Sequence, residues 1–156
     1  MTETFANRIY VDSNVLIYAV EGVPATAEPA KRLITFLRAN RNLMFTSEIS
    51  LGEVLAPPKR RGAWPLHTKR RVYLDLLVFS GTATLIPVSR DILIGTAELR
   101  KTIPLRLHDA IHLLSAIRWD CKFMVSGDAH FKRLPPNMVH VLPDDRGIDS
   151  LLRDIA

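Results

Sequence analysis

Short apolar runs alternate with longer stretches of helical periodicity along the chain, and this alternation constrains the fold more than any other feature. The runs are rich in β-branched and aromatic residues, as buried strands are. They fall at residues 8–11, 43–45, 85–88, 121–125 and 139–142. Strands separated by helices predict an α/β fold with a mostly parallel central sheet of four to five strands flanked by helices. Pro87 makes the third run an edge strand or a broken strand.

The stretches between these runs have the spacing of amphipathic helices. Pro24 separates the first two helices, and Pro57 ends a later one. Between the second and third strands, a helix is expected to place Val72, Leu76 and Phe79 on one apolar face. The expected helices begin near residue 12, cover residues 27–40, include residue 53, follow residue 67, run from residue 89 to about residue 101, and begin at residue 109.

Composition favours one soluble domain over residues 1–156, with 47% hydrophobic and 24% charged residues. Cys121 is the single cysteine, so no disulfide forms within the chain, which suits a reducing cytoplasm. No run approaches the roughly 20 apolar residues of a membrane span, and residues 1–6 lack the pattern of a signal peptide. The net charge of +5 is compatible with a polyanionic substrate.

Four acidic residues stand where such a fold gathers functional groups. Asp12 and Asp128 follow predicted strands, Asp109 begins a predicted helix, and Glu53 lies on the helix after the second strand. Since these places share one edge of a parallel sheet, we expect the carboxylates to converge. Two carboxylates about 4 Å apart repel by about 4 kcal/mol at an effective dielectric constant near 20. A divalent cation removes this repulsion, and Mg²⁺ or Mn²⁺ suits oxygen ligands.

Each carboxylate also has a purely structural interpretation. Asp12 could cap the helix that follows it. Glu53 stands three residues after Ser50, which is the spacing of a capping box. Asp109 could serve the N-terminal dipole of its helix, and Asp128 could be an ordinary turn residue.

Four segments in order resemble the PIN domain family, and in particular the VapC-type toxins of toxin–antitoxin pairs. They are YVDSNVLIYA at residues 10–19, the block at residues 47–55, LHDAIH at residues 107–112, and VSGDAHF at residues 125–131. The resemblance covers essentially the whole chain. It implies a Mg²⁺- or Mn²⁺-dependent ribonuclease toxin that is inhibited by a small cognate antitoxin, and commonly a homodimer.

The resemblance places the family's acidic quartet on Asp12, Glu53, Asp109 and Asp128. We expect Asp12 and Asp109 to be direct metal ligands. Glu53 would bind the metal or orient the attacking water, and Asp128 would act through water or a second metal ion.

The family's polar residue two positions before the last acid is Ser126, and Ser126 and Asn14 are expected to orient carboxylates. Many family members carry a second acid where this chain has His130, which puts the polarity of the rim of the site in question.

His112 lies one helical turn after Asp109, at i+3, so the two side chains can meet. It is interpreted either as a residue that orients Asp109 or as a buried histidine that packs against the sheet. A zinc site built from His108, His112 and His130 is the less favoured interpretation, because Cys121 lies far from them in sequence. Cys121 itself is expected to be a small core residue.

Basic residues concentrate between residues 59 and 71, where Lys59, Arg60, Arg61 and the aromatic Trp64 are candidates for RNA contact. Basic side chains bind phosphates, and an aromatic ring can stack on a base. The alternative is a solvated face without a ligand. Two further candidates, closer to the last acid, are Lys132 and Arg133.

Two other functions stay open from the sequence. A PIN nuclease could process RNA without an antitoxin, and a catalytically silent PIN fold could bind only RNA or protein. A phosphatase with a nucleophilic aspartate is disfavoured, because that chemistry expects a second Asp two residues after the first, where this chain has Asn14.

Overall fold

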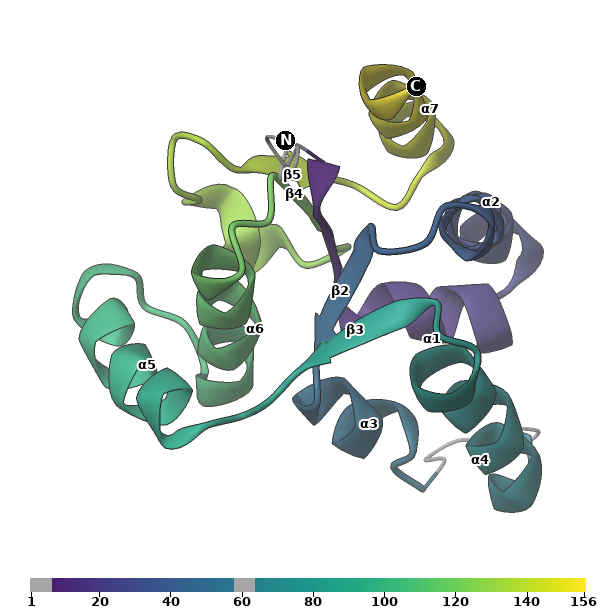
Figure 1. Cartoon of the computed structure of the whole chain (residues 1–156), viewed down its shortest axis with the longest axis horizontal. Helices are drawn as coiled ribbons and strands as arrows, with labels where there is room; N and C mark the ends of the chain where they lie inside the picture. Colours follow the sequence, from purple (N-terminus) through teal and green to yellow (C-terminus); the bar gives the residue numbers. More distant parts are fainter. Residues whose placement is uncertain (1–6, 58–63) are drawn as a thin grey trace.

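One parallel sheet forms the centre of the protein (Figure 1). The structure is a computed structural model that describes residues 7–57 and 64–156. The strands are β1 (Ile9–Val11), β2 (Met44–Ser47), β3 (Ala83–Ile86), β4 (Phe123–Val125) and β5 (Val139–Val141). Their order is β3-β2-β1-β4-β5, and every pairing is parallel. The predicted α/β fold is therefore confirmed, and β3 is an edge strand that ends just before Pro87.

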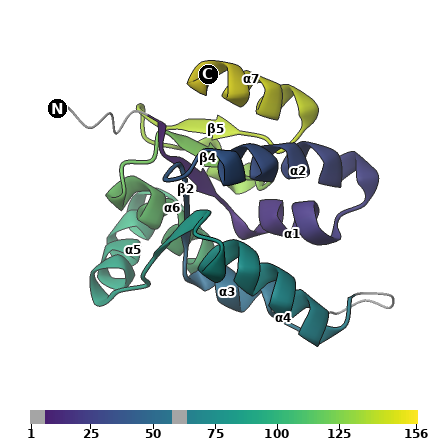
Figure 2. The ribbon, with the colours of Figure 1, turned by 45° about the vertical axis from the view of Figure 1, so that its right-hand side comes forward.

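Helices cover both faces of this sheet (Figures 1 and 2). The α-helices of the described residues are α1 (Ser13–Glu21), α2 (Pro24–Ala39), α3 (Ile49–Val54), α4 (Leu66–Leu74), α5 (Arg90–Thr102), α6 (Leu107–Arg118) and α7 (Asp145–Ile155). In Figure 1, α5 and α6 lie together on one side of the sheet, whereas α1, α2, α4 and α7 lie on the other. None of the helices in the described ranges is long and apolar enough to cross a membrane.

Alternation along β1 divides the core between these two faces. Ile9 and Val11 pack in the cluster that includes α1, α2 and α7, whereas Tyr10 packs with residues of α6 on the opposite face. All three side chains are fully buried. Because β1 is buried on both faces and paired on both sides, it is a rigid support for the residue that follows it, Asp12.

A π-helical turn changes the face that the helix after Trp64 buries. The turn, η2 (Asp75–Phe79), continues α4, and the amide of Ser80 donates to the carbonyl of Asp75 at 2.8 Å. The extra residue in this turn rotates the positions after it about the helix axis. As a result, Leu76 and Leu77 are buried and Phe79 is 75% exposed. The prediction that Phe79 would share the buried face was wrong for this reason.

Several element boundaries also differ from the predictions. α2 begins at Pro24 rather than at residue 27, because proline is well suited to the first turn of a helix. α6 begins at Leu107, so Asp109 lies inside its first turn. The C-terminal helix α7 was not predicted. It buries Ile148 and Leu151 and is held to α2 by Arg32, which binds Asp145 at 2.8 Å and Asp149 at 2.6 Å.

A buried ion pair joins α1 to α4. The ammonium of Lys69 lies 3.6 Å from a carboxylate oxygen of Glu21, and it donates to the carbonyl of Ala56 at 3.2 Å. The hydroxyl of Tyr73 donates to the other oxygen of Glu21 at 2.6 Å. The side chains of Lys69 and Glu21 are 7% and 10% exposed, so each charge depends on the other for compensation.

Replacing Glu21 by Gln should lower the free energy of unfolding by about 3 kcal/mol, because the buried ammonium of Lys69 loses its counter-charge. Urea unfolding would measure the change. The matched control is Glu98→Gln, which breaks the exposed pair with Lys101 and should cost less than about 1 kcal/mol. Equal losses in the two variants would contradict the structural importance of the buried pair.

Candidate metal centre

The strand order reverses between β1 and β4, and the candidate site lies at that point. From β1 the chain proceeds to β2 and β3 on one side, whereas β4 and β5 extend the sheet on the other. In parallel sheets, functional groups gather beyond the carboxyl ends of strands at such a switch point. Asp12 directly follows β1, and its amide donates to the carbonyl of Val125, the last residue of β4, at 3.0 Å.

A hollow of about 280 Å³ opens at this point. It is lined by Asp12, Ser13, Asn14, Ile17, Glu53, Arg106, His108, Asp109 and Asp128. The four acids of the predicted quartet thus line one hollow, although they come from four separate segments of the chain. This convergence follows from the parallel topology, which brings the starts of α1 and α6 and the end of β4 together with α3.

Asp12 is the most firmly held of these acids. It is 4% exposed and accepts hydrogen bonds from the Ser13 amide at 2.7 Å, the Ser126 hydroxyl at 2.7 Å and the Asn14 amide group at 3.3 Å. Burial raises the pKa of Asp12, although the charge of His112 and the bond from Ser126 act in the opposite direction. Asp12 does cap α1, so its structural role and its place in the site coexist.

Ser126 and Asn14 connect Asp12 to the loop that carries Asp128. The Ser126 hydroxyl accepts from the Asp128 amide at 3.0 Å while it donates to Asp12. The side-chain oxygen of Asn14 accepts from the Gly127 amide at 3.3 Å. These bonds fix the two loops at the carboxyl ends of β1 and β4 relative to each other.

Glu53 is held by a histidine rather than by a capping box. Its Oε1 lies 2.5 Å from Nε2 of His112, and its side chain is 31% exposed. The Ser50 hydroxyl bonds instead to that of Thr46 at 2.8 Å, so the capping-box interpretation was wrong. Burial alone would raise the pKa of Glu53, but the bond and charge of His112 outweigh it and lower that pKa.

His112 does not hydrogen-bond Asp109, the partner that one sequence-based interpretation gave it. Besides Glu53, its Nε2 lies 3.5 Å from Asp12 Oδ1, and its Nδ1 lies 2.6 Å from the hydroxyl of Tyr10. Burial alone would lower the pKa of His112, but the bond to Glu53 and the negative charge of Asp12 raise it. With 1% of its surface exposed, it is buried, as the other interpretation stated.

Asp109 is paired with two basic side chains that lie close to it along the chain. Nε of Arg106 lies 3.1 Å from Asp109 Oδ2, and Nε2 of His108 lies 3.3 Å from Oδ1. Sequence analysis did not name Arg106, although its i, i+3 spacing to Asp109 was a usable signal.

The fourth acid, Asp128, pairs with His130, the residue that departs from the family pattern. Asp128 Oδ1 accepts from the His130 amide at 2.8 Å and lies 2.6 Å from His130 Nδ1. Burial alone would raise the pKa of Asp128, but these bonds outweigh it and lower that pKa. Ligand atoms of Asp109, Asp128 and His130 lie within 4.8 Å of one another.

The donor set fits a divalent cation. Carboxylate oxygens dominate the wall, which favours a hard ion such as Mg²⁺ or Mn²⁺, and the imidazole of His130 adds one nitrogen that Mn²⁺ accepts more readily. The raised pKa of Asp12 marks a carboxylate that lacks full compensation without such an ion.

Two of the predicted RNA-contact residues have described side chains, and these two are not part of this wall. Trp64 is 40% exposed and Arg133 is exposed, and neither lines the hollow. Lys59, Arg60, Arg61 and the side chain of Lys132 lie outside the described residues. The guanidinium of Arg106 lines the hollow instead.

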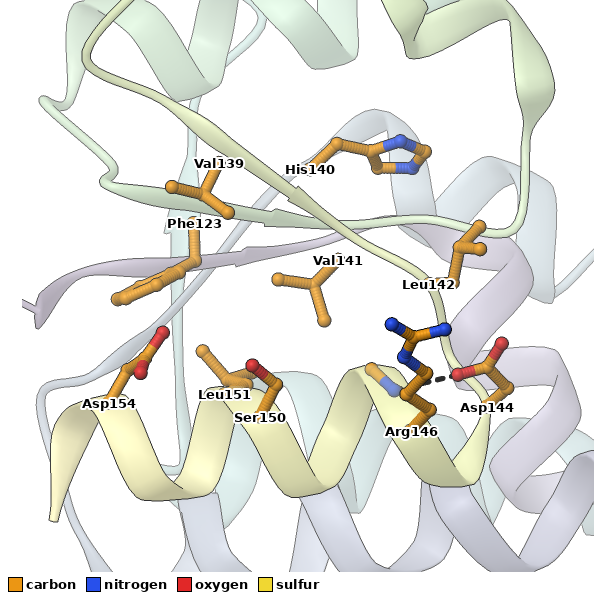
Figure 3. A pocket seen from close by; sticks show the side chains of 11 residues that line it. Phe123, Val139, His140, Val141, Leu142, Asp144, Arg146, Ser150, Leu151 and Asp154 are labelled. Carbon is orange, nitrogen blue, oxygen red and sulfur yellow. Dashed lines mark hydrogen bonds between the residues drawn. The ribbon is translucent and has the colours of Figure 1, made fainter.

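A second hollow, of about 360 Å³, lies between β5 and α7 (Figure 3). Its two acids do not converge, because Asp144 and Asp154 stand at opposite ends of α7 in this view. Asp144 caps that helix by accepting from the Gly147 amide at 2.7 Å. The wall is otherwise largely apolar, with Phe123, Val141 and Leu151, so the acidic hollow is the better candidate for metal chemistry.

Comparison with known proteins agrees with this geometry. The PIN domain model matches residues 9–136, so the chain belongs to the PIN domain family. A chain of a toxin–antitoxin complex from Klebsiella pneumoniae is 26% identical, with a TM-score of 0.62 over 84% of this chain and 95% of that one. VapBC2 from Rickettsia felis, bound to a DNA fragment from its promoter, shares the fold at 20% identity and a TM-score of 0.62, over 86% of this chain and 98% of that one. Among curated proteins, none matches significantly.

Replacing Asp12 by Asn should raise the melting temperature of the metal-free protein at pH 7. Because the pKa of Asp12 is raised in the fold, its charged form costs stability above that pKa, and the cost disappears as the pH falls through it. Thermal unfolding in a chelator at several pH values would measure this, and the gain should shrink as the solution is acidified.

The same variant should lose most of the stabilisation that added Mn²⁺ gives the wild-type protein. At a hundredfold excess over its dissociation constant, an ion bound only to the folded state contributes about 2.7 kcal/mol. An Asp12→Asn protein that is less stable than the wild type without metal, or equally stabilised by Mn²⁺, would contradict the site.

Proposed function

We propose that this chain is a Mg²⁺- or Mn²⁺-dependent endoribonuclease and the toxin of a toxin–antitoxin pair. The observation that carries the proposal is the convergence of Asp12, Glu53, Asp109 and Asp128 around one hollow in a PIN fold. The similarity to a chain from a toxin–antitoxin complex supports the assignment as a toxin.

The four acids would have different roles in phosphodiester hydrolysis. Asp12 and Asp109 would hold the ion, with Asp128 as a further or water-mediated ligand. A divalent ion bound there supplies an activated water and stabilises charge on the phosphate and the leaving oxygen. Glu53, partly exposed at the hollow, would bind or orient that water as a base.

Arg106 is the residue best placed to bind the substrate beside the hollow. Its side chain is 66% exposed while its Nε holds Asp109, so the rest of the guanidinium faces solvent beside the hollow. A planar guanidinium binds phosphate well, which would place a backbone phosphate next to the acids. RNA as the substrate class rests on the resemblance to VapC-type toxins.

The proposed antitoxin would inhibit by charge. A basic side chain inserted among the four carboxylates would occupy the space that the ion needs, and would be attracted by the same negative charges. A homodimer is also proposed, because apolar side chains remain exposed on the helix after Trp64, with Phe79 75% and Val78 44% exposed. A reducing cytoplasm suits the single buried cysteine, Cys121.

Replacing Asp109 by Asn should abolish RNA cleavage without unfolding the protein, since the change removes one charge at nearly constant shape. Cleavage of RNA by purified protein with Mn²⁺ would measure this, and a chelator should abolish wild-type activity. Asp154→Asn, at an exposed position on α7 outside the acidic hollow, is the control and should cleave normally. Normal cleavage by Asp109→Asn would remove Asp109 from the site.

Co-expression with the protein encoded by a neighbouring small open reading frame should give a complex that copurifies and lacks nuclease activity. Adding excess Mn²⁺ should restore activity in part, since ion and antitoxin would compete for the same carboxylates. If no neighbouring gene product binds while the isolated chain cleaves RNA, the function is RNA processing without an antitoxin. An active complex would contradict inhibition at this site.

A further inference from the structure

We propose that His112 is a positioning residue that holds Glu53 in place, and that Tyr10 anchors the imidazole of His112 to the sheet. The inference deepens the proposed nuclease function and rests on it. It concerns residues that the family's acidic quartet does not include.

Hydrogen bonds link the sheet to Glu53 through Tyr10 and His112. The backbone amide of Ser47, at the end of β2, donates to the Tyr10 hydroxyl oxygen at 3.0 Å. The same hydroxyl lies 2.6 Å from Nδ1 of His112. An ionised carboxylate only accepts hydrogen bonds, so Nε2 of His112 carries the proton that is directed at Glu53 Oε1, 2.5 Å away.

Burial makes this arrangement rigid. Tyr10 is fully buried in β1, and His112 is 1% exposed in the twelve-residue helix α6, which packs on the sheet. Glu53 belongs to α3, a helix of only six residues. A free glutamate has three rotatable side-chain bonds and, at 31% exposure, could point into water. The bond from His112 therefore connects the Glu53 carboxylate, on a short helix, to the rigid sheet and restricts its motion.

Packing alone does not account for a histidine at this position. Its neighbours Ile111, Leu113 and Leu114 on α6 are apolar and buried, and an apolar residue would fill the same space without a polar atom to satisfy. Both ring nitrogens of His112 are instead paired, one with the sheet and one with the wall of the acidic hollow. Its Nε2 also lies 3.5 Å from Asp12, so one donor spans two of the four acids.

Two substitutions separate positioning from packing. His112→Gln retains an amide donor at about the place of Nε2, whereas His112→Leu fills the space without a donor. We expect His112→Leu to lower kcat for RNA cleavage about 10- to 100-fold and to raise the Mn²⁺ concentration for half-maximal activity, with the KM for RNA unchanged. His112→Gln should recover most of the loss. Melting temperatures and circular dichroism would confirm that both variants are folded.

A measurement on the wild-type protein tests the inference without any nuclease assay. Nitrogen NMR of the histidine side chains should show a proton on Nε2 of His112, because that nitrogen donates to the Glu53 carboxylate. An unprotonated Nε2 in the wild type would overturn the inference, as would a His112→Leu protein with wild-type kcat or a His112→Gln protein as impaired as His112→Leu. An inactive wild-type protein would instead count against the proposed function and leave the NMR result to decide the role of His112.

Discussion

Repulsion among four carboxylates around one hollow is the constraint on which the rest of the site depends. Two like charges about 4 Å apart repel by about 4 kcal/mol at an effective dielectric constant near 20. The fold offsets this with a separate donor for each acid: Ser126 for Asp12, His112 for Glu53, Arg106 for Asp109, and His130 for Asp128. Three of these donors carry or can acquire positive charge, which opposes the repulsion among the acids.

The compensation is incomplete where the chain is most buried. Asp12 has a raised pKa despite its hydrogen bonds, whereas Glu53 and Asp128, which are more exposed, have lowered ones. Burial therefore leaves the carboxylate of Asp12 in need of a cation. The outer acids are already ionised and able to complete the ion's coordination or orient water.

Local patterns were enough to predict the strands, because each strand is a short apolar run. The parallel topology and the family resemblance were enough to predict that the four acids would line one hollow. The face of the helix after Trp64 was mispredicted, because a π turn at Asp75–Phe79 interrupts the α-helical periodicity on which the prediction rested. α7 did have a signal, since Ile148, Leu151, Leu152 and Ile155 recur at helical spacing.

The partners of His112 could not be predicted from the sequence for another reason. Its contact with Glu53 spans 59 residues and that with Tyr10 spans 102, so only the strand order brings them together. The sequence predicted Asp109 as a partner because helical spacing indicates contacts only between residues of the same helix. In the structure, Asp109 is held by Arg106 and His108 from its own turn.

The central claim is that the acids at the carboxyl ends of β1 and β4 hold a divalent ion, and anomalous diffraction from crystals grown with Mn²⁺ tests it most directly. The account predicts a peak inside the hollow, at coordination distance from the carboxylates of Asp12 and Asp109, and its loss in crystals of Asp12→Asn protein. A wild-type hollow that stays empty at saturating Mn²⁺, or a peak that lies only outside the hollow, would contradict it.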